Sequence, residues 1–331
     1  MATPRIGSEL IVDALQVACR APSFHNTQPW RWTLTGNRVD LYLDPSRRAE
    51  AADGSGRQAL LSCGAVLDHF RVAIAASGWI GTVSRFPDPQ NSRHLASVAL
   101  TPASSVSPAQ RRRVDAIMAR RTDRLAFLES PDGMAHLVEA LHTSEHADAV
   151  RLDTISDQHR STVAELSQLT DAIRMFDTDY HSELDWWTDT FATDVGIPAT
   201  ALISAPESDR VAIGRNFPVT NQPERRAEIA EDRAHLLVVS SVDDSADSVL
   251  RCGEALSAIL LDATMAGLAT CIVTHVTELA SGRDVVASLT GSHAIPQALI
   301  RIGRIDALES PPPPTPRRDV HDVLHLREEA S

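Results

Sequence analysis

The segment Ser62-Cys63-Gly64-Ala65-Val66-Leu67 has a counterpart in Arg251-Cys252-Gly253-Glu254-Ala255-Leu256. Each segment opens an apolar stretch that ends at a glycine, Gly78 in the first and Gly267 in the second, and the stretches align without gaps at one constant offset. Apolar residues on most faces predict a buried helix of about 14 residues, roughly 21 Å long, in each stretch. Each closing glycine suits the left-handed position that commonly follows a helix end.

Strand-like runs follow both stretches, at 79–85 in the first and at 268–276 in the second. An alternating partner strand comes after each run, at 94–100 and at 298–303. The repeated order of helix, strand and strand predicts a duplicated α+β unit. Convergence of two buried helices that share their apolar spacing is the alternative.

Other elements follow from apolar periodicity and from residues that cap helices. Helices are predicted at 8–20, 107–121, 131–142 and 156–176, and strands at 31–34, 39–43, 150–152 and 235–239. The first two strands are separated by Thr-Gly-Asn, which predicts a hairpin. Ser107 and Pro108 suit the N-cap and the first position of the second helix.

The stretch 178–233 is unusually long for a connection and is rich in acidic, polar and proline residues. Loops of this length in a compact domain are commonly lids or disordered segments. The adjacent Trp186 and Trp187 favour a lid insertion that packs on the rest of the chain, and a surface excursion with some apolar anchoring is the alternative. Near the end of the chain, the prolines of 311–316 predict an extended strap that leads to Arg317 and Arg318.

Charge and composition exclude several classes of function. The 331 residues carry a net charge of −13, which argues against nucleic acids and anionic membranes as partners because both select basic surfaces. All 31 basic residues are arginines. A chain without lysine has no Schiff-base lysine, hence no ordinary pyridoxal phosphate catalysis, and it has no Walker A loop.

Cysteine and histidine spacing predicts no metal site. The four cysteines are widely spaced, so neither a zinc site nor a disulfide framework is indicated. His142 with His146, and His321 with His325, have four-residue spacing, but no carboxylate or cysteine pattern completes either pair. Neither a run of about 18 apolar residues nor a signal-peptide pattern is found, which predicts a cytoplasmic protein.

Two segments are dense in side chains that bind ligands. The first is the loop Ala21-Pro22-Ser23-Phe24-His25-Asn26-Thr27-Gln28-Pro29-Trp30-Arg31-Trp32, between a predicted helix and a predicted strand. The second is Arg120-Arg121-Thr122-Asp123-Arg124-Leu125-Ala126-Phe127, and six arginines fall within 111–124. Guanidinium groups bind phosphate dianions through paired hydrogen bonds. Taken alone, the second segment predicts either an anion site or a basic helix end on the surface.

Both segments resemble motifs of the flavin-dependent nitroreductase family. The loop matches the family pattern A-P-S-x-x-N-x-Q-P-W-R-W without a gap, and the second segment resembles the element R-[RH]-[ST]-x-[RK]-x-x-F. The R-R-T-D-R variant, the N-x-Q-P-W-R-W loop and the double length resemble the Acg-type subfamily of actinobacteria, which is associated with hypoxia and dormancy responses. The resemblance covers most of the chain except 178–233.

The resemblance implies that the chain is an FMN-binding flavoprotein. Arg120, Arg121 and Thr122 would then hold the phosphate and ribityl oxygens, and Arg124 would lie at the N1/O2 edge of the flavin. The implied binding residues of the loop are Pro22, Ser23, Phe24, His25, Asn26 and Gln28. Arg317 and Arg318 resemble a C-terminal basic pair that returns to the FMN phosphate. No catalytic side chain is expected because the flavin carries the electrons, and His25 is expected to stack or to hydrogen-bond within its loop.

Family members form homodimers in which one subunit supplies the arginine motif and the other supplies part of the loop. Here each motif occurs once. The resemblance therefore implies a nitroreductase-like fold of two fused half-molecules, 1–106 and 107–331, that form an intramolecular pseudo-dimer with one flavin site. The lid insertion at about 178–233 belongs to the second half, and a monomer is expected to suffice for one site.

The function implied by the resemblance depends on the insertion. If it opens, NAD(P)H and then a small aromatic, nitro or quinone acceptor would alternate on the flavin, as in an NAD(P)H-dependent reductase. If it stays closed, the chain would store FMN or sense redox state. These two alternatives leave open whether the chain is an enzyme, and an interaction protein without flavin is the third.

Overall fold

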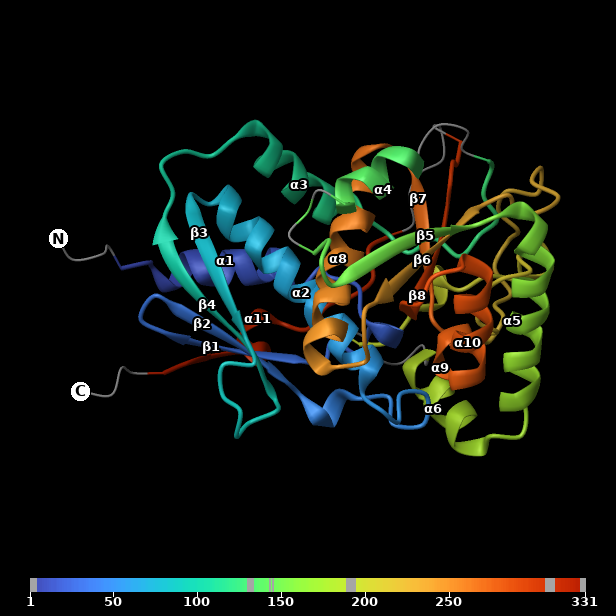
Figure 1. The fold of residues 1–331 in the computed structure, drawn as a ribbon, viewed down its shortest axis with the longest axis horizontal. Coiled ribbons are helices and arrows are strands. Elements are labelled where there is room, and N and C mark those ends of the chain that lie inside the picture. The colour runs from blue at the N-terminus through green and yellow to red at the C-terminus, as the bar shows by residue number, and fades with distance from the viewer. Residues whose placement is uncertain are drawn as a thin grey trace.

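The computed structural model describes residues 5–129, 134–142, 144, 146–188, 195–306 and 313–327. Within these residues, two sheets lie on either side of a central pair of helices, α2 (Arg57–Ala76) and α8 (Ala246–Met265) (Figure 1). Each central helix has 20 residues, which corresponds to roughly 30 Å. Helices and sheets together confirm the predicted α+β class.

Two sheets account for the described strands. The first sheet has the order β3 (Trp79–Arg85), β4 (His94–Pro102), β2 (Arg38–Leu43), β1 (Trp30–Thr35) and β9 (Leu324–Leu326). The second sheet has the order β5 (Val150–Ile155), β6 (His235–Ser241), β8 (Ile295–Gly303) and β7 (Ala269–Val273). Neighbouring strands are antiparallel except for β1 and β9, which pair in parallel. The last described strand thus lies in the sheet of the first half, and the division into 1–106 and 107–331 stays a prediction.

The remaining helices cover the two sheets. Those described are α1 (Ser8–Ala18), α3 (Pro108–Ala119), α4 (Met134–His142), α5 (Arg160–Arg174), α6 (Thr178–Thr188), α7 (Ala205–Asp209), α9 (His275–Glu278), α10 (Ala280–Thr290) and α11 (Val320–Val323), with 3-10 turns at Phe24–Asn26, Pro45–Arg47, Asp157–His159 and Ala199–Ala201. The predicted start of α3 is confirmed, because Ser107 and Gln110 form a capping box there.

Apolar residues fill the space between the helices and both sheets. In the first half, Trp30 and Trp32 of β1 pack with Phe70 of α2 in one buried cluster. The second sheet is buried on both faces: Leu237 packs toward α8, whereas Val238 packs toward α5 and α10. A fully buried apolar side chain contributes about 1.5–3 kcal/mol, so these clusters hold the two halves around the central helices.

Two glycines set the distance between α2 and α8. A Cβ on Gly64 would lie 2.1 Å from the carbonyl oxygen of Leu250, and a Cβ on Gly253 would lie 2.2 Å from that of Leu61. Leu61 and Leu250 occupy equivalent positions in the two repeated segments. The contact is therefore reciprocal, as in an isologous two-fold interface, and the predicted pseudo-dimer is confirmed at the level of packing.

Two predicted elements differ from those observed. The strand predicted at 268–276 ends at Val273, where its pairing with β8 ends, and the chain turns into α9 so that Val276 enters the core. The insertion, expected as a loop, contains α6 and α7. α6 forms because Tyr180, Leu184 and Trp187 recur at helical spacing and are buried together on one face. Residues 131–133 of one predicted helix and residues 311–312 of the strap lie outside the described residues.

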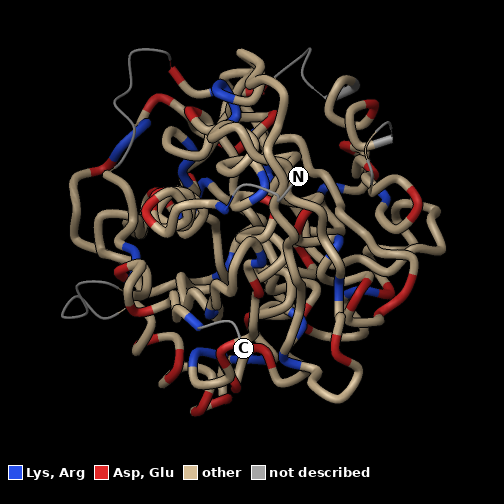
Figure 2. Tube along the Cα trace, turned by 90° about the vertical axis from the view of Figure 1, so that its left-hand side faces the viewer, with Lys and Arg blue, Asp and Glu red and all other residues tan. Residues whose placement is uncertain are grey.

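Charged residues of both signs are interspersed along the chain (Figure 2). Among the described residues, α2 is the one helix with the length and apolar composition to cross a membrane. It lies at the centre of the fold and is mostly buried, as is typical of a core helix.

Candidate functional site

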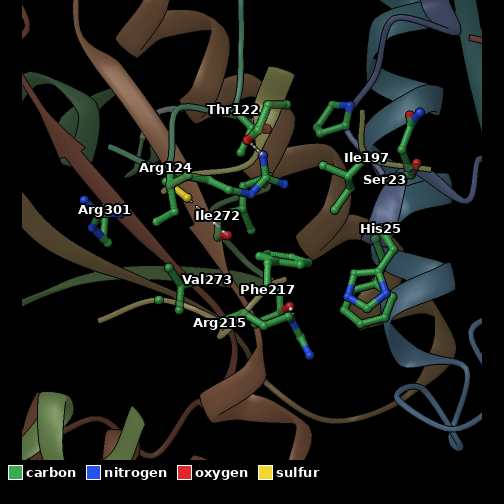
Figure 3. Close-up of a pocket in the computed structure, with 18 of the residues that line it drawn as sticks. Ser23, His25, Thr122, Arg124, Ile197, Arg215, Phe217, Ile272, Val273 and Arg301 are labelled. Carbon is green, nitrogen blue, oxygen red and sulfur yellow. Dashed lines mark hydrogen bonds between the residues drawn. The ribbon is translucent and has the colours of Figure 1, made fainter. Parts of the chain in front are cut away.

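A cavity of about 430 Å³ opens between the two halves. The loop before β1 and the first turns of α2 line it from the first half, and 120–124, the strand β7 and the insertion line it from the second (Figure 3). The volume falls within the range of sites for small organic ligands. The two motifs that the sequence singles out, about 100 residues apart, thus meet at one place.

The loop holds an unusual backbone conformation. His25, Asn26 and Gln28 have φ values of 48°, 56° and 52°, in the left-handed region that non-glycine residues seldom adopt. Each such residue costs on the order of 1–3 kcal/mol unless its surroundings fix it. Hydrogen bonds do so here: Phe24 N donates to Ser62 Oγ at 3.0 Å, and Gln28 N donates to Ser23 Oγ at 3.0 Å.

His25 lies in the cavity wall as a neutral ring. It stacks on Phe24 with centroids 4.0 Å apart, and Phe217 meets its edge at 5.8 Å. Burial holds the pKa of His25 well below its ordinary value, and Arg215 and Arg124 lower it further. Both ring nitrogens are buried without a hydrogen-bond partner in the described chain. Stacking is one of the roles that the sequence predicts for His25, and a general acid is not favoured.

Arg120, Arg121 and Arg317 are among the residues that line the cavity. Arg120 is 6% exposed, and its Nε has no hydrogen-bond partner among the described residues. Burial lowers the pKa of Arg120 to about 10, with Arg20 and Arg121 contributing as like charges. Burial, together with the like charges of Arg20 and Arg120, also holds the pKa of Arg317 well below its ordinary value. Like charges packed in a buried place are costly unless an anion neutralises them.

Arg124 also lines the cavity, beside Phe217 of the insertion (Figure 3). Its guanidinium donates to the carbonyl oxygen of Ala201 at 3.0 Å and lies 5.0 Å from the centre of the Phe217 ring. Burial lowers the pKa of Arg124. Arg215 lies on the other side of Phe217 and is bound by Glu278 and by the hydroxyl of Tyr180. The Phe217 ring therefore lies between two cations.

The insertion forms a wall of the cavity, as expected of a lid. Ile197, Ala201, Ile203 and Phe217 are among its lining residues. The two tryptophans differ in their environment: Trp187 is 8% exposed and accepts a 2.7 Å hydrogen bond from Ile197 N at its carbonyl, whereas Trp186 is 69% exposed. Only the second tryptophan packs on the body of the protein.

Most of the predicted binding residues meet at the cavity. Those that line it are Pro22, Ser23, Phe24, His25, Asn26, Arg120, Arg121, Thr122, Arg124 and Arg317. Gln28 and Arg318 are not among the lining residues and contact each other instead: Arg318 N donates to Gln28 Oε1 at 2.9 Å. Their role in binding FMN stays a prediction for all twelve residues.

Several lining residues were not predicted. Gln58 and Ser62 project from the same face of α2, and Gln58 Nε2 is buried without a partner among the described residues. Polar side chains four residues apart in the otherwise apolar stretch 58–67 were the signal that could have identified them. Arg215 and Phe217 carry no such signal, because nothing in their sequence neighbourhood says which loop residues turn inward.

Asp171 of α5 also lines the cavity. Burial raises its pKa to about 6, although Arg215 and the amide of Asn216 oppose that shift. The cysteines are all buried thiols, and burial raises the pKa of each. In the part of the chain that the structure describes, no group of three or more His, Cys, Asp or Glu side chains could hold a metal ion.

No family model matches the chain. Among curated proteins, it is 54% identical over 323 residues to a protein of Mycobacterium tuberculosis provisionally named NAD(P)H nitroreductase acg, and the alignment covers 97% of both chains. The chain belongs to the nitroreductase family. A second relative from that organism, Rv3131, also provisionally named as an NAD(P)H nitroreductase, is 36% identical over 97% of this chain and 93% of its own. The resemblance drawn from the motifs is confirmed, and these nitroreductase relatives share the double length.

Solved structures with similarity to this chain include nitroreductases described as FMN-bound or FMN-dependent. A nitroreductase of Bacteroides fragilis with bound FMN has a TM-score of 0.38, with 16% identity, 60% of this chain and 92% of its own covered. NfnB of sphigopyxis, described as FMN- and NADPH-dependent, has a TM-score of 0.41, with 13% identity, 65% of this chain and 98% of its own covered.

Proposed function

We propose that this nitroreductase-family chain binds one FMN in the cavity between its two halves. The observation that supports the proposal is the buried guanidinium of Arg120: among the described residues its Nε has no partner, and the charged neighbours that shift its pKa, Arg20 and Arg121, are like charges. A phosphate dianion would neutralise that cluster and accept its hydrogen bonds. FMN, which is named in the description of a similar nitroreductase structure, carries such a group.

The rest of the cavity fits the remainder of the molecule. Gln58 Nε2 and the ring nitrogens of His25 are buried polar atoms without partners in the described chain, and they would bind the polar edge of a flavin or its ribityl chain. Phe24, His25 and Phe217 offer ring faces and edges for an aromatic ligand. Phosphate, polar chain and ring system would thus each have matching groups.

The bound flavin would supply hydride transfer, and the protein would position it and set its electrostatics. Arg120, Arg121 and Thr122 would hold the phosphate and ribityl oxygens. The cation of Arg124 would favour negative charge at the N1/O2 edge. Neutral His25 would pack the loop against the ring system. No side chain is required as a nucleophile or as an essential acid.

The fused layout explains why one chain would form one site. The loop of the first half and the arginine segment of the second meet across the local two-fold that relates α2 and α8. Two complete sites would need a second copy of each motif, and the sequence contains one. We propose that duplication and fusion of an ancestral subunit produced this arrangement, and that a monomer is sufficient for binding.

Turnover depends on the lid. With the lid open, NAD(P)H and then a nitro or quinone acceptor would reach the flavin, and the chain would be a reductase. With the lid closed, as its contacts in the cavity favour, the chain would hold FMN as a store or a redox sensor. Phe217 supports the second reading, because its ring lies inside the cavity between Arg124 and Arg215.

Anaerobic mixing of the FMN-loaded protein with excess NADPH or NADH tests these alternatives. Rapid loss of the visible flavin band would support the reductase, and the acceptors could then be sought. A stable yellow protein that photoreduction bleaches but neither nicotinamide does would support storage or sensing. A colourless protein that takes up no FMN on reconstitution would refute the proposal.

A further inference from the structure

We infer that Arg317 and Arg318 are positioning residues that hold the strained loop 25–28, and that phosphate recognition falls to Arg120. The inference deepens the proposed function and rests on it for the identity of the ligand. The geometry of the latch, the segment Pro313–Arg318 with its contacts to the loop, is independent of any ligand.

The guanidinium of Arg317 donates its hydrogen bonds to oxygen atoms of the protein itself. Nε donates to the carbonyl oxygen of Cys19 at 2.8 Å, and one terminal nitrogen donates to those of Arg20 and Ala21 at 3.1 and 3.3 Å. The other terminal nitrogen donates to Thr315 Oγ1 at 2.6 Å and to the carbonyl oxygens of Thr315 and Pro316. The side chain therefore caps the C-terminal end of α1, where unpaired carbonyls carry partial negative charge.

Arg318 continues the latch with contacts to Gln28 and Trp30. Its backbone N donates to Gln28 Oε1 at 2.9 Å, and its guanidinium donates to the carbonyl oxygens of Gln28 and Trp30 at 3.2 and 3.3 Å. Asn26 of the loop also contacts the strap: its Nδ2 donates to the carbonyl oxygen of Pro316 at 3.1 Å. Two of the three left-handed residues are thus tied directly to the strap.

Arg120 contrasts with both. It is buried at the end of α3, its Nε has no partner among the described residues, and the charges that act on it are the cations Arg20 and Arg121. A guanidinium whose donors are already used by carbonyls would have to give up those bonds to bind a phosphate, whereas Arg120 gives up none. The same anion would also relieve the repulsion within the cluster.

The loop needs contacts such as those with the strap to keep its strained backbone conformation. Three non-glycine residues of one short loop are stable in the left-handed conformation only when their surroundings fix them. The loop places His25 and Phe24 in the cavity wall, so a loop that relaxes would remove the ring faces that a flavin needs. Loss of the latch should weaken binding of any flavin, with or without a phosphate.

Hydrogen exchange of the flavin-free protein provides the first test. The variants Arg317→Met and Arg318→Met should raise amide exchange in peptides covering 19–30 by about tenfold or more and leave the second sheet unchanged. Arg317→Lys, a milder change, should behave in the same way, because an ammonium cannot reach all these carbonyls. Arg120→Met serves as the comparison and should leave exchange in 19–30 unchanged. Unchanged exchange in all three latch variants would overturn the inference.

Titration with FMN and with riboflavin, which lacks the phosphate, provides the second test. The wild type should prefer FMN, and Arg120→Met should lose about tenfold or more of that preference. Arg317→Lys and Arg318→Met should weaken both ligands by similar factors and keep the preference. A lost preference in Arg317→Met with unchanged exchange would make Arg317 a phosphate ligand and overturn the inference. If the wild type binds neither ligand, the proposed function fails, and the exchange data still decide the role of the latch.

Discussion

Ser257 Oγ donates a 2.6 Å hydrogen bond to Asp68 Oδ2 across the contact between α8 and α2. The two residues are 189 positions apart, the offset that relates the repeated segments, so they occupy equivalent places in the two halves. Both are buried. Two aspartates facing each other here would repel, whereas a carboxyl and a hydroxyl satisfy each other. A fused chain can differ at such a place, and a homodimer cannot.

Asp68→Asn should stabilise the protein at neutral pH. Burial raises the pKa of Asp68 to about 6, although Ser257, Arg113 and Arg71 oppose the shift. The folded state then keeps a proton that the unfolded state has lost, so the free energy of unfolding falls by up to about 3 kcal/mol as pH rises from about 4 to above 6. Asp68→Asn has no carboxyl at this place, so its free energy of unfolding should not fall in this way. Urea unfolding across this range should show its advantage above pH 6 and none near pH 4.

Exposed Asp284 provides the matched control for that experiment. Asp284→Asn should leave the stability close to that of the wild type, because its side chain is exposed and packs little in the fold. An advantage of Asp68→Asn that persists unchanged in acid would show that the carboxyl does not titrate as its burial requires.

Gly64→Ala and Gly253→Ala should each destabilise the fold by about 3 kcal/mol, because the new methyl group would overlap a backbone carbonyl of the facing helix. Gly54→Ala is the control, since a Cβ there lies 3.8 Å from the nearest atom. Denaturant midpoints measure the difference. Near-wild-type stability in both helix variants would mean that α2 and α8 do not approach as described.

The sequence predicts the central helices well because their burial leaves an apolar pattern that local composition reveals. The same holds for the β1 and β2 hairpin, whose turn residues are local. The parallel pairing of β9 with β1 was not predicted, because a three-residue strand at the end of the chain has no periodicity of its own.

The two motifs of the site were visible in the sequence, and their meeting in one cavity follows the layout that the family resemblance implies. The roles of Arg317 and Arg318 were not readable, because an arginine beside a phosphate motif looks the same whether its donors face a ligand or nearby carbonyls. Phe217 was missed for a related reason: its position depends on how a long insertion folds over the cavity, which no local pattern records.

Trp187→Ala should speed the reduction of bound flavin by NAD(P)H by at least about tenfold. Removal of a buried tryptophan side chain costs about 3–5 kcal/mol of packing free energy. This loss should destabilise the closed position of the lid. Trp186→Ala is the control within the same pair, because that ring is 69% exposed and should contribute little. Stopped-flow absorbance compares the rates. Equal rates in both variants would show that the buried tryptophan does not control access to the flavin.

Arg124→Met should lower the midpoint potential of bound FMN. If Arg124 lies at the N1/O2 edge as proposed, loss of this half-buried cation would destabilise the anionic reduced form. A loss of about 1.4 kcal/mol would lower the potential of a two-electron couple by roughly 30 mV. Arg93→Met, at an exposed position outside the cavity, should leave the potential unchanged. Equilibrium reduction against a reference dye measures both. An unaltered potential in Arg124→Met would place that guanidinium away from the flavin edge.

Native mass spectrometry of the chain after reconstitution with excess FMN tests the central claim most directly, because it counts chains and flavins in the same particle. We expect one chain with one FMN, and an Arg120→Met variant with much of that occupancy lost. A particle with two flavins per chain, one flavin shared by two chains, or no flavin at all would contradict a single site assembled from the two halves of one chain.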